Sequence, residues 1–247
     1  MKFLVIGDSC TDTFIYGNCE RICPEAPVPV FNPVRTIVTG GMSKNVQRNI
    51  QALNVECDVV TNDNNILKTR YVDKKTNQML LRVDENDFTE ERFNIKSIDF
   101  SSYDAIVISD YDKGFLHSMD INFICLKHDH VFLDTKRKID WWLPASLRYL
   151  KINQYEYDNS KSHLMLLEEL LPDKLIVTRS GAGCMFRHKL IPPPVKVEAR
   201  DLSGAGDTFL AGFAVAIMRG DGVYKSIDFA QECAATVVAK RGVATVS

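Results

Sequence analysis

Short apolar, β-branched runs alternate with segments of helical periodicity along most of this chain. The runs predict strands at 3–7, 57–60, 104–109, 130–134, 149–153, 174–178 and 243–246. The intervening periodicity predicts helices near 42–54, 115–128, 160–170, 207–219 and 223–240. Strands that alternate with helices form βαβ units, and right-handed crossovers place the helices on both faces of the sheet. The pattern therefore predicts an α/β fold with a mostly parallel central sheet.

Two stretches interrupt this alternation and predict a small second sheet. Residues 24–38 are extended and rich in proline, which is typical of an edge strand or an exposed flap. Residues 68–84 consist of two strand-like halves joined by a polar turn at 73–77, which predicts an antiparallel pair. Since the 247 residues contain no low-complexity linker or internal repeat, we expect one domain over 1–247. About 13–38 and 68–84 would form a β lid over one end of its sheet.

The charge and cysteine content argue against several classes of protein. With 30 Lys and Arg against 32 Asp and Glu, the net charge of −2 gives no electrostatic reason to expect nucleic acid or a membrane as a partner. No apolar run approaches the roughly 20 residues that span a bilayer, and the N-terminal run is too short for a signal peptide. The seven cysteines are scattered, and Cys19 and Cys23 lack the second pair that a zinc site needs. We expect a reduced, cytoplasmic enzyme.

A glycine-rich turn near the C-terminus carries the strongest chemical signal. The segment Asp201-Leu-Ser-Gly-Ala-Gly-Asp207 runs directly into a predicted helix. Small residues let the backbone approach a ligand closely, and the N–H groups and positive dipole end of a helix favour an anion. A carboxylate beside such a site fits phosphoryl transfer, in which it takes a hydroxyl proton. The residues alone leave open the alternative that Asp207 only caps the helix.

Two motifs in the expected order resemble the ribokinase-like (PfkB) family of sugar kinases. Asp-x-x-Gly-Ala-Gly-Asp-Thr-Phe at 201–209 is similar to the C-terminal family signature, and Gly40-Gly41-Met-Ser-Lys-Asn45 matches the N-terminal Gly-Gly-x-x-x-Asn motif. Segments at 7–12, 21–30, 80–84, 109–114 and 177–180 resemble the kinase half of bacterial ADP-heptose synthesis enzymes. The resemblance implies ATP- and Mg²⁺-dependent phosphorylation of D-glycero-D-manno-heptose 7-phosphate at the C1 hydroxyl, giving the 1,7-bisphosphate. The alternatives are a kinase for another sugar or sugar phosphate, or a catalytically weak relative that binds nucleotide or sugar.

The resemblance also implies roles for individual residues. Asp207 would be the catalytic base, beside an anion hole formed by the backbone of Gly204, Ala205 and Gly206. The residues implied to bind the sugar phosphate are Asp12, Gly40, Gly41, Asn45, Arg82, Lys113 and Lys136, with Arg70 in a similar segment. The residues implied on the nucleotide side are Asn153, Thr178, Arg179, Gly181, Gly183, Asp201, Gly204 and Gly206. The small residues Ala234, Ala235, Thr236 and Ala239 of the last predicted helix suit either an adenine contact or tight helix packing.

Two further acidic positions have competing interpretations. Asn153-Gln-Tyr-Glu156 resembles the family's Asn-x-x-Glu motif, which implies that Asn153 and Glu156 help to hold Mg²⁺, an ion that takes oxygen ligands and keeps several waters. The alternative is an Asx turn that opens the next helix. We expect Asp8 to serve the end of the sheet rather than the substrate.

The chain departs from the family between Val60 and Lys68, where longer relatives carry a further strand–helix unit. A polar loop replaces that unit, so we expect a narrower sheet or an exposed edge. Met42 and Lys44 bring bulk and charge near the sugar. No His-x-Gly-His segment follows, so we do not expect the chain to make a nucleotide-activated sugar. Lids of this family often clasp one another, and the apolar residues Val28, Val30, Ile37 and Val38 would suit a homodimer.

Overall fold

The computed structural model describes residues 1–63, 66–160, 171–195, 197, 201–240 and 244–246. Its centre is an eight-stranded sheet with the order β12-β11-β10-β9-β8-β7-β1-β4. The parallel strands are β4 (Glu56–Val60), β1 (Lys2–Gly7), β7 (Ala105–Asp110), β8 (Val131–Thr135), β9 (Tyr149–Asn153) and β10 (Leu175–Thr178). An antiparallel edge is added by β11 (Cys184–Phe186) and β12 (Lys189–Ile191). The prediction of a mostly parallel α/β sheet is confirmed.

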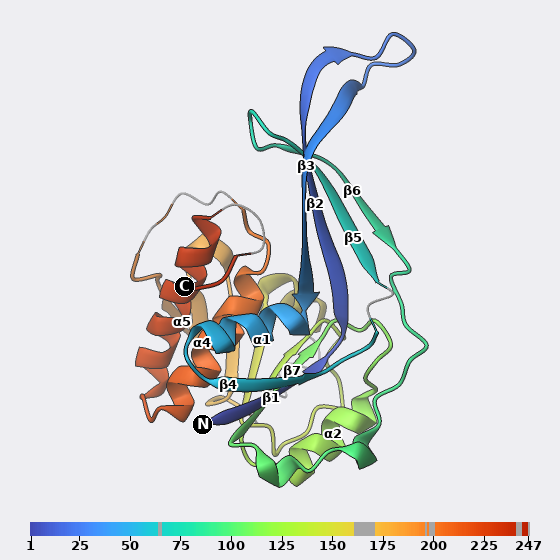
Figure 1. Cartoon of the computed structure of the whole chain (residues 1–247). Helices are drawn as coiled ribbons and strands as arrows, with labels where there is room; N and C mark the ends of the chain where they lie inside the picture. Colours follow the sequence, from blue (N-terminus) through green and yellow to red (C-terminus); the bar gives the residue numbers. More distant parts are fainter. Residues whose placement is uncertain (64–65, 161–170, 196, 198–200, 241–243, 247) are drawn as a thin grey trace.

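Helices cover both faces of this sheet (Figure 1). One face packs against α1 (Ser43–Ala52), α4 (Ala205–Met218) and α5 (Val223–Val238), and the other against α2 (Ser118–Lys127) and the short 3-10 turns Ile95–Ser97 and Phe100–Ser102. Alternate residues of β1 enter opposite cores, with Phe3 and Val5 on the α4 side and Leu4 and Ile6 on the α2 side. Burial on both faces explains why these strands are continuous apolar runs. Among the described residues, no helix has the length and apolarity needed to cross a membrane.

A four-stranded second sheet, with the order β3-β2-β5-β6, projects from one end of the main sheet (Figure 1), and we call this sheet the lid. A long hairpin consists of β2 (Ser9–Ile22) and β3 (Pro29–Met42), and β5 (Leu67–Asp73) pairs parallel with β2 and antiparallel with β6 (Met79–Glu85). The proline-containing strand β3 lies at the edge of this sheet. The chain enters β2 directly after the carboxyl end of β1 and begins α1 directly after β3. The base of the lid therefore lies at the carboxyl end of the parallel strands.

Several details of the predicted secondary structure need correction. The strand predicted at 243–246 is wrong for residues 244–246, which have no regular structure, and residue 243 lies outside the described residues. The short strands β11 and β12 were not predicted, because three residues carry too little periodicity. The helix predicted at 115–128 begins only at Ser118. Of the helix predicted at 160–170, only residue 160 is described, and it is helical, as are the preceding residues from 154.

The short connection after β4 has the expected consequence. β4 ends at Val60 and β5 begins at Leu67, so no strand–helix unit fits between them. In the strand order, β4 is the last strand on its side of the main sheet. β4 is therefore an edge strand of the main sheet.

Candidate active site

Two pockets at the carboxyl ends of the parallel strands meet at one carboxylate. The first, beneath the lid, has a volume of about 340 Å³; we call it the lid pocket. The second, between β9, β10 and helices α4 and α5, has a volume of about 930 Å³; we call it the groove. Both are lined by Arg82, Tyr111, Lys136, Gly204 and Asp207. Open α/β sheets bind their ligands at this end, so two ligands bound here would meet at Asp207.

Asp207 lies in the first turn of α4 and is 4% exposed. Its Oδ1 accepts a hydrogen bond from the Tyr111 hydroxyl at 2.8 Å, and its Oδ2 accepts one from Asn45 Nδ2 at 3.0 Å. The N-cap of α4 is Gly204, in the left-handed conformation with φ 80°, and no side chain caps the helix. The alternative that Asp207 is a helix cap is therefore wrong. Burial raises the pKa of Asp207, and the two hydrogen bonds offset only part of that rise.

The glycine turn that precedes Asp207 is backed by a buried lysine. Gly204, Ala205 and Gly206 line the groove at the start of α4, where the dipole is positive. A Cβ on Gly206 would lie 2.9 Å from Lys151 Nζ, so only glycine fits there without displacing the ammonium group. Lys151 is 2% exposed and pairs with Asp134 at 2.7 Å. A helix start and an ammonium group therefore favour an anion at the same place.

The floor of the lid pocket contains a buried ion pair between two lid strands. Asp12 of β2 pairs with Arg70 of β5, and their side chains are 8% and 10% exposed. Gly41 of β3 lies against this pair, and a Cβ there would be 2.1 Å from Asp12 Oδ2 and 2.7 Å from Cys10 Sγ. The glycine at 41 therefore leaves the space that the Asp12 carboxylate occupies, and Asp12 lines the pocket as the sequence implied.

The lid pocket carries several cations, each with a carboxylate partner. Lys68 Nζ lies 3.2 Å from Asp84 and 2.9 Å from Asp87. Arg82 pairs with Asp84 at 2.7 Å, and Lys113 pairs with Asp87. The prediction that Arg82 and Lys113 face a common pocket agrees with this lining. An anionic ligand here would compete with the carboxylates for cations that are already in place.

Lys136 lies on the wall that the two pockets share. Its Nζ is 2.7 Å from Glu156 and 3.3 Å from Asp134, and it lies 5.3 Å from the centroid of the Tyr111 ring. Burial alone would lower the pKa of Lys136, but the carboxylates of Asp134 and Glu156 outweigh it and raise the pKa above its usual range. Lys136 is therefore a fixed positive charge beside Asp207.

Gly40 and Met42 flank the Gly41 position and differ in their placement. The Gly40 carbonyl accepts a hydrogen bond from Arg48 Nη2 at 2.9 Å, and Gly40 does not line the lid pocket. Met42 does line it, is 4% exposed and has a φ of 56°, a conformation that costs energy for a residue with a side chain. The expectation that Met42 brings bulk near the sugar agrees with this position, whereas Lys44 packs over Gly40 outside the lining.

Most of the residues implied on the nucleotide side line the groove. They are Asn153, Thr178, Gly181, Gly183, Gly204 and Gly206, joined by Ala234 and Ala235 of α5. Arg179 and Asp201 do not line it, nor do Thr236 and Ala239. Instead, Arg179 Nε donates to Gln154 at 2.6 Å, and Asp201 Oδ1 accepts from the Ser203 N–H at 2.8 Å. The rest of the groove wall combines apolar side chains, among them Val195, Val197, Leu202 and Val238, with the cations Arg82, Lys136 and Lys151.

Asn153 and Glu156 bind each other. Asn153 Oδ1 accepts the Glu156 N–H at 2.9 Å, and Glu156 Oε2 accepts the Asn153 N–H at 2.7 Å. This reciprocal pair is a capping box that opens the helical stretch at 154–160. The local turn that we considered as an alternative is therefore present, and Glu156 Oε1 also accepts from Asn153 Nδ2 and Lys136. Asn153 lines the groove and Glu156 stands one side chain behind it.

Sequence reasoning missed Tyr111, Lys151 and Lys68 as site residues. Lys151 had a readable signal, because a lysine in a strand that is otherwise buried needs a partner or a function. Tyr111 directly follows a predicted strand, so its hydroxyl could have been considered as a functional group of the site. Within the part of the chain that the structure describes, no cluster of three His, Cys, Asp or Glu side chains is arranged to hold a metal.

Solved structures with the same architecture define the class of fold. A ribokinase from Thermotoga maritima superposes with a TM-score of 0.74 at 18% identity and covers 98% of this chain and 94% of its own. The phosphofructokinase-2 from Escherichia coli superposes with a TM-score of 0.69 at 12% identity, over 98% and 93% of the two chains. The fold is therefore ribokinase-like, as the sequence implied.

The sequence comparisons identify the family. The model of the pfkB family carbohydrate kinases matches residues 40–247, so the chain belongs to this family and is a carbohydrate kinase by family. It is 29% identical to the "Bifunctional protein HldE" of Nitratiruptor sp. over all of this chain and 63% of that protein, and 31% identical to that of Sulfurimonas denitrificans over 62% of its length. The chain thus spans under two thirds of these relatives. The first alignment has 294 positions against 247 residues, so the relatives carry insertions that this chain lacks.

Proposed function

We propose that the chain transfers the γ-phosphoryl group of ATP to a hydroxyl of a sugar phosphate, with Asp207 as the base. The observation that carries the proposal is the position of Asp207 on the wall shared by a cation-lined pocket and a larger groove. The sugar hydroxyl would attack the γ-phosphorus from the lid pocket while ADP leaves into the groove. Asp207 takes the hydroxyl proton, and Lys151, Lys136 and the start of α4 stabilise charge on the moving group.

We further propose D-glycero-D-manno-heptose 7-phosphate as the acceptor, at its C1 hydroxyl. Two observations support this substrate. The matched relatives are HldE proteins, whose kinase half the sequence resembles. The lid pocket also brings together Lys68, Arg70, Arg82, Lys113 and Lys136, which suits a substrate that already bears a phosphate. Other sugars and sugar phosphates are outcomes of the same test.

Mg²⁺ would enter with ATP rather than occupy a cage of its own. Mg²⁺ keeps several waters and is bound by one or two carboxylates together with substrate phosphates. Asn153 lines the groove, and Glu156 is held behind it by the capping box. We propose that these two residues orient the waters of an ATP-bound Mg²⁺, which would neutralise phosphate charge.

We also propose a homodimer through the lid. Apolar side chains are exposed along the lid, with Val38 of β3 at 61%, Leu81 of β6 at 56% and Val28, in the connection between β2 and β3, at 51%. A second copy covering this surface would remove it from water. Sedimentation of the wild type against Val38→Asp measures this: we expect a dimer that the substitution shifts to monomer, and a wild-type monomer would contradict it.

The central test is ADP release from ATP with a panel of sugars and sugar 7-phosphates. We expect turnover to be fastest with the heptose 7-phosphate and to fall about 10²- to 10⁴-fold in Asp207→Asn. Asp221→Asn is the matched control and should retain activity, because Asp221 is exposed and lies just after α4, the helix that contains Asp207. Substrate-dependent ADP release that survives in Asp207→Asn would remove the base from Asp207. Absence of turnover on every sugar would favour a binding relative.

A further inference from the structure

The catalytic carboxylate of the proposed function is held from two sides by elements far apart in the sequence. Asn45 of α1 donates to Asp207 Oδ2, and Tyr111, in the loop after β7, donates to Oδ1. We propose that Tyr111 is a positioning residue for phosphoryl transfer, whose hydroxyl keeps the Asp207 carboxylate ionised and aimed into the lid pocket. This inference rests on the proposed function, since it gives Tyr111 a role only if Asp207 is the base.

The two donors fix the carboxylate without exhausting it. A carboxylate oxygen accepts at about two lone-pair sites, and each Asp207 oxygen receives one hydrogen bond from these donors. Rotation of the carboxylate about its Cβ–Cγ bond would break both bonds. The remaining lone pairs of Asp207, which lines the lid pocket, stay available to a sugar hydroxyl.

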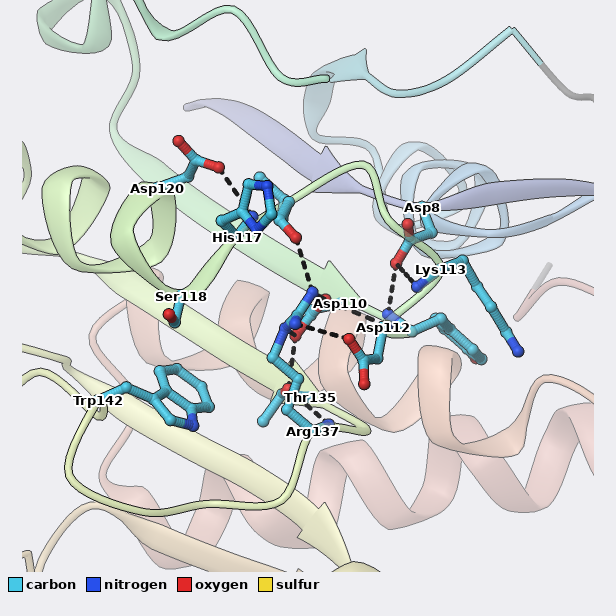
Figure 2. Close-up of polar contacts among 12 residues, drawn as sticks. Asp8, Asp110, Asp112, Lys113, His117, Ser118, Asp120, Thr135, Arg137 and Trp142 are labelled. Atoms are coloured by element: carbon cyan, nitrogen blue, oxygen red, sulfur yellow. Dashed lines mark hydrogen bonds and ion pairs between the residues drawn. The ribbon is translucent and has the colours of Figure 1, made fainter. Parts of the chain in front are cut away.

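The loop that carries Tyr111 is fastened to the sheet by a fully buried carboxylate. Asp8, which follows β1, accepts the main-chain N–H groups of Tyr111 at 2.8 Å, Lys113 at 3.3 Å and Phe115 at 3.2 Å. Figure 2 shows the Asp8 carboxylate directed at this loop. This agrees with the expectation that Asp8 serves the end of the sheet. By holding the loop there, Asp8 also positions Tyr111.

A second buried carboxylate holds the start of the same loop. Asp110 is 1% exposed and is bound by Arg137 Nε at 2.8 Å and by the Thr135 hydroxyl at 2.6 Å (Figure 2). Arg137 also reaches Asp112 at 2.6 Å, and Asp112 has a φ of 56°. A loop that only connected β7 to α2 would not need two buried carboxylates, which are costly to desolvate. The cost is explained if the position of Tyr111 matters.

The hydroxyl of Tyr111 is suited to donate at every pH at which the enzyme would work. Burial and the neighbouring Asp207 raise the pKa of Tyr111 well above its usual value, so the phenol stays protonated. The ring is held separately, by packing against Cys10 and Met42 and by Lys136 above its face. Tyr111→Phe therefore removes the donor and leaves the packing.

Several other charged or titratable groups act on Asp207 and must be weighed in a pH experiment. They are Arg48 of α1, Cys10 of β2, Asp134 of β8 with the following Lys136, and Lys151 of β9. Tyr111→Phe changes none of them. A hydrogen bond to the ionised form lowers a carboxyl pKa, so its loss should raise the pKa of Asp207.

The test is the pH dependence of kcat for the wild type, Tyr111→Phe and Tyr103→Phe, with saturating ATP and the best sugar phosphate. Tyr103 also donates to a carboxylate, Asp58 at 3.0 Å, but remote from the site, and is the matched control. We expect Tyr111→Phe to lower kcat about tenfold at neutral pH and to shift the acid limb to higher pH. The KM for ATP should stay within twofold, and Tyr103→Phe should match the wild type.

The position of the acid limb does not depend on the fraction of folded enzyme, so it remains informative if Tyr111→Phe is less stable. In the Asp207→Asn background, Tyr111→Phe should cause no further loss, because the two residues act together. If the wild type turns over and Tyr111→Phe has the same acid limb and the same kcat as the wild type, this proposal is overturned and the proposed function is not. Absence of wild-type turnover would overturn the proposed function and this proposal with it.

Discussion

The lid pocket and the groove meet at Asp207 but are built from different materials. The lid pocket is walled by charged side chains from β2, β5, β6 and the loop after β7, which pair with one another across strands. Apart from Lys151 and the charged residues that it shares with the lid pocket, the groove is walled by glycine turns after β10 and at α4, and by mainly small and apolar side chains of α5. The lid pocket therefore presents paired charges to its ligand, whereas the groove, away from Lys151 and the shared wall, presents shape and backbone.

This difference determines how ligand recognition in each pocket should respond to substitution. A wall of paired charges discriminates strongly, because a ligand that does not replace a partner leaves a buried charge unpaired. A wall of small residues discriminates by volume, where one extra methylene is worth only about 1–3 kcal/mol. We therefore expect a substitution that breaks the buried Asp12–Arg70 pair of the lid pocket to have a larger effect than a substitution in the groove, and to act on the sugar alone.

Gly41→Ala should give the largest effect that separates the two sides. The new Cβ would lie 2.1 Å from Asp12 Oδ2, so Asp12 must move and Arg70 loses its partner. Breaking a buried ion pair costs about 3–5 kcal/mol, of which we expect about 3 kcal/mol in sugar recognition, or 10²-fold in kcat/KM. The KM for ATP should stay within twofold. Initial rates with each substrate varied in turn measure both quantities.

Gly222→Ala is the matched control for this substitution. Gly222 has an ordinary φ of −67°, and no atom lies within 4 Å of the place that a new methyl group would take, so the substitution should leave both constants unchanged. If Gly41→Ala raised the KM for ATP by the same factor as it lowered kcat/KM for the sugar, the two pockets would be coupled through the lid. The comparison between them would then be wrong.

The residues that could be predicted from the sequence and those that could not belong to different kinds of structure. Regular elements were predictable because β1, β7 and β8 are apolar runs buried on both faces, and their type follows from burial alone. The roles implied for Asp207 and Gly41 depend on short motifs, and both residues lie at the site. By contrast, the contact of Tyr111 with Asp207 joins residues 96 positions apart. No local pattern encodes such a contact, because it depends on how the loop after β7 is tied to Asp8.

Asn153 and Glu156 have two interpretations for a similar physical reason. Their spacing fits both a metal-associated motif and a capping box, since both need an amide or hydroxyl three residues before a carboxylate. The capping box is formed, with both main-chain bonds below 3 Å. Only the position of Lys136, which directly follows the neighbouring strand β8, brings Glu156 into the electrostatics of the site. That neighbour is a property of strand order, which the sequence does not spell out locally.

Ala235→Leu should give a smaller effect on the opposite side. Ala235 lines the groove, and a larger side chain there would intrude on the space for the nucleotide base. Overpacking of this kind costs about 1–3 kcal/mol, so we expect the KM for ATP to rise roughly tenfold while the KM for the sugar stays within twofold. Ala239→Leu, at the C-terminal end of the same helix and outside the lining, is the control. Equal effects of the two substitutions would mean that α5 only packs and does not contact the nucleotide.

Asp87→Asn should give the smallest effect and one of opposite sign. Asp87 bridges Lys68, at 2.9 Å, and Lys113 across the lid pocket, with a side chain that is 41% exposed. A substrate phosphate binding these lysines must displace the carboxylate, so its loss should lower the KM for a sugar phosphate about two- to fivefold, the size expected for a partly exposed pair. The KM for the same sugar without phosphate should not change, because that sugar does not bind the two lysines. If the KM fell for both sugars, Asp87 would block the pocket by its volume. If the KM rose for the sugar phosphate and not for the free sugar, Asp87 would organise the two lysines for their ligand.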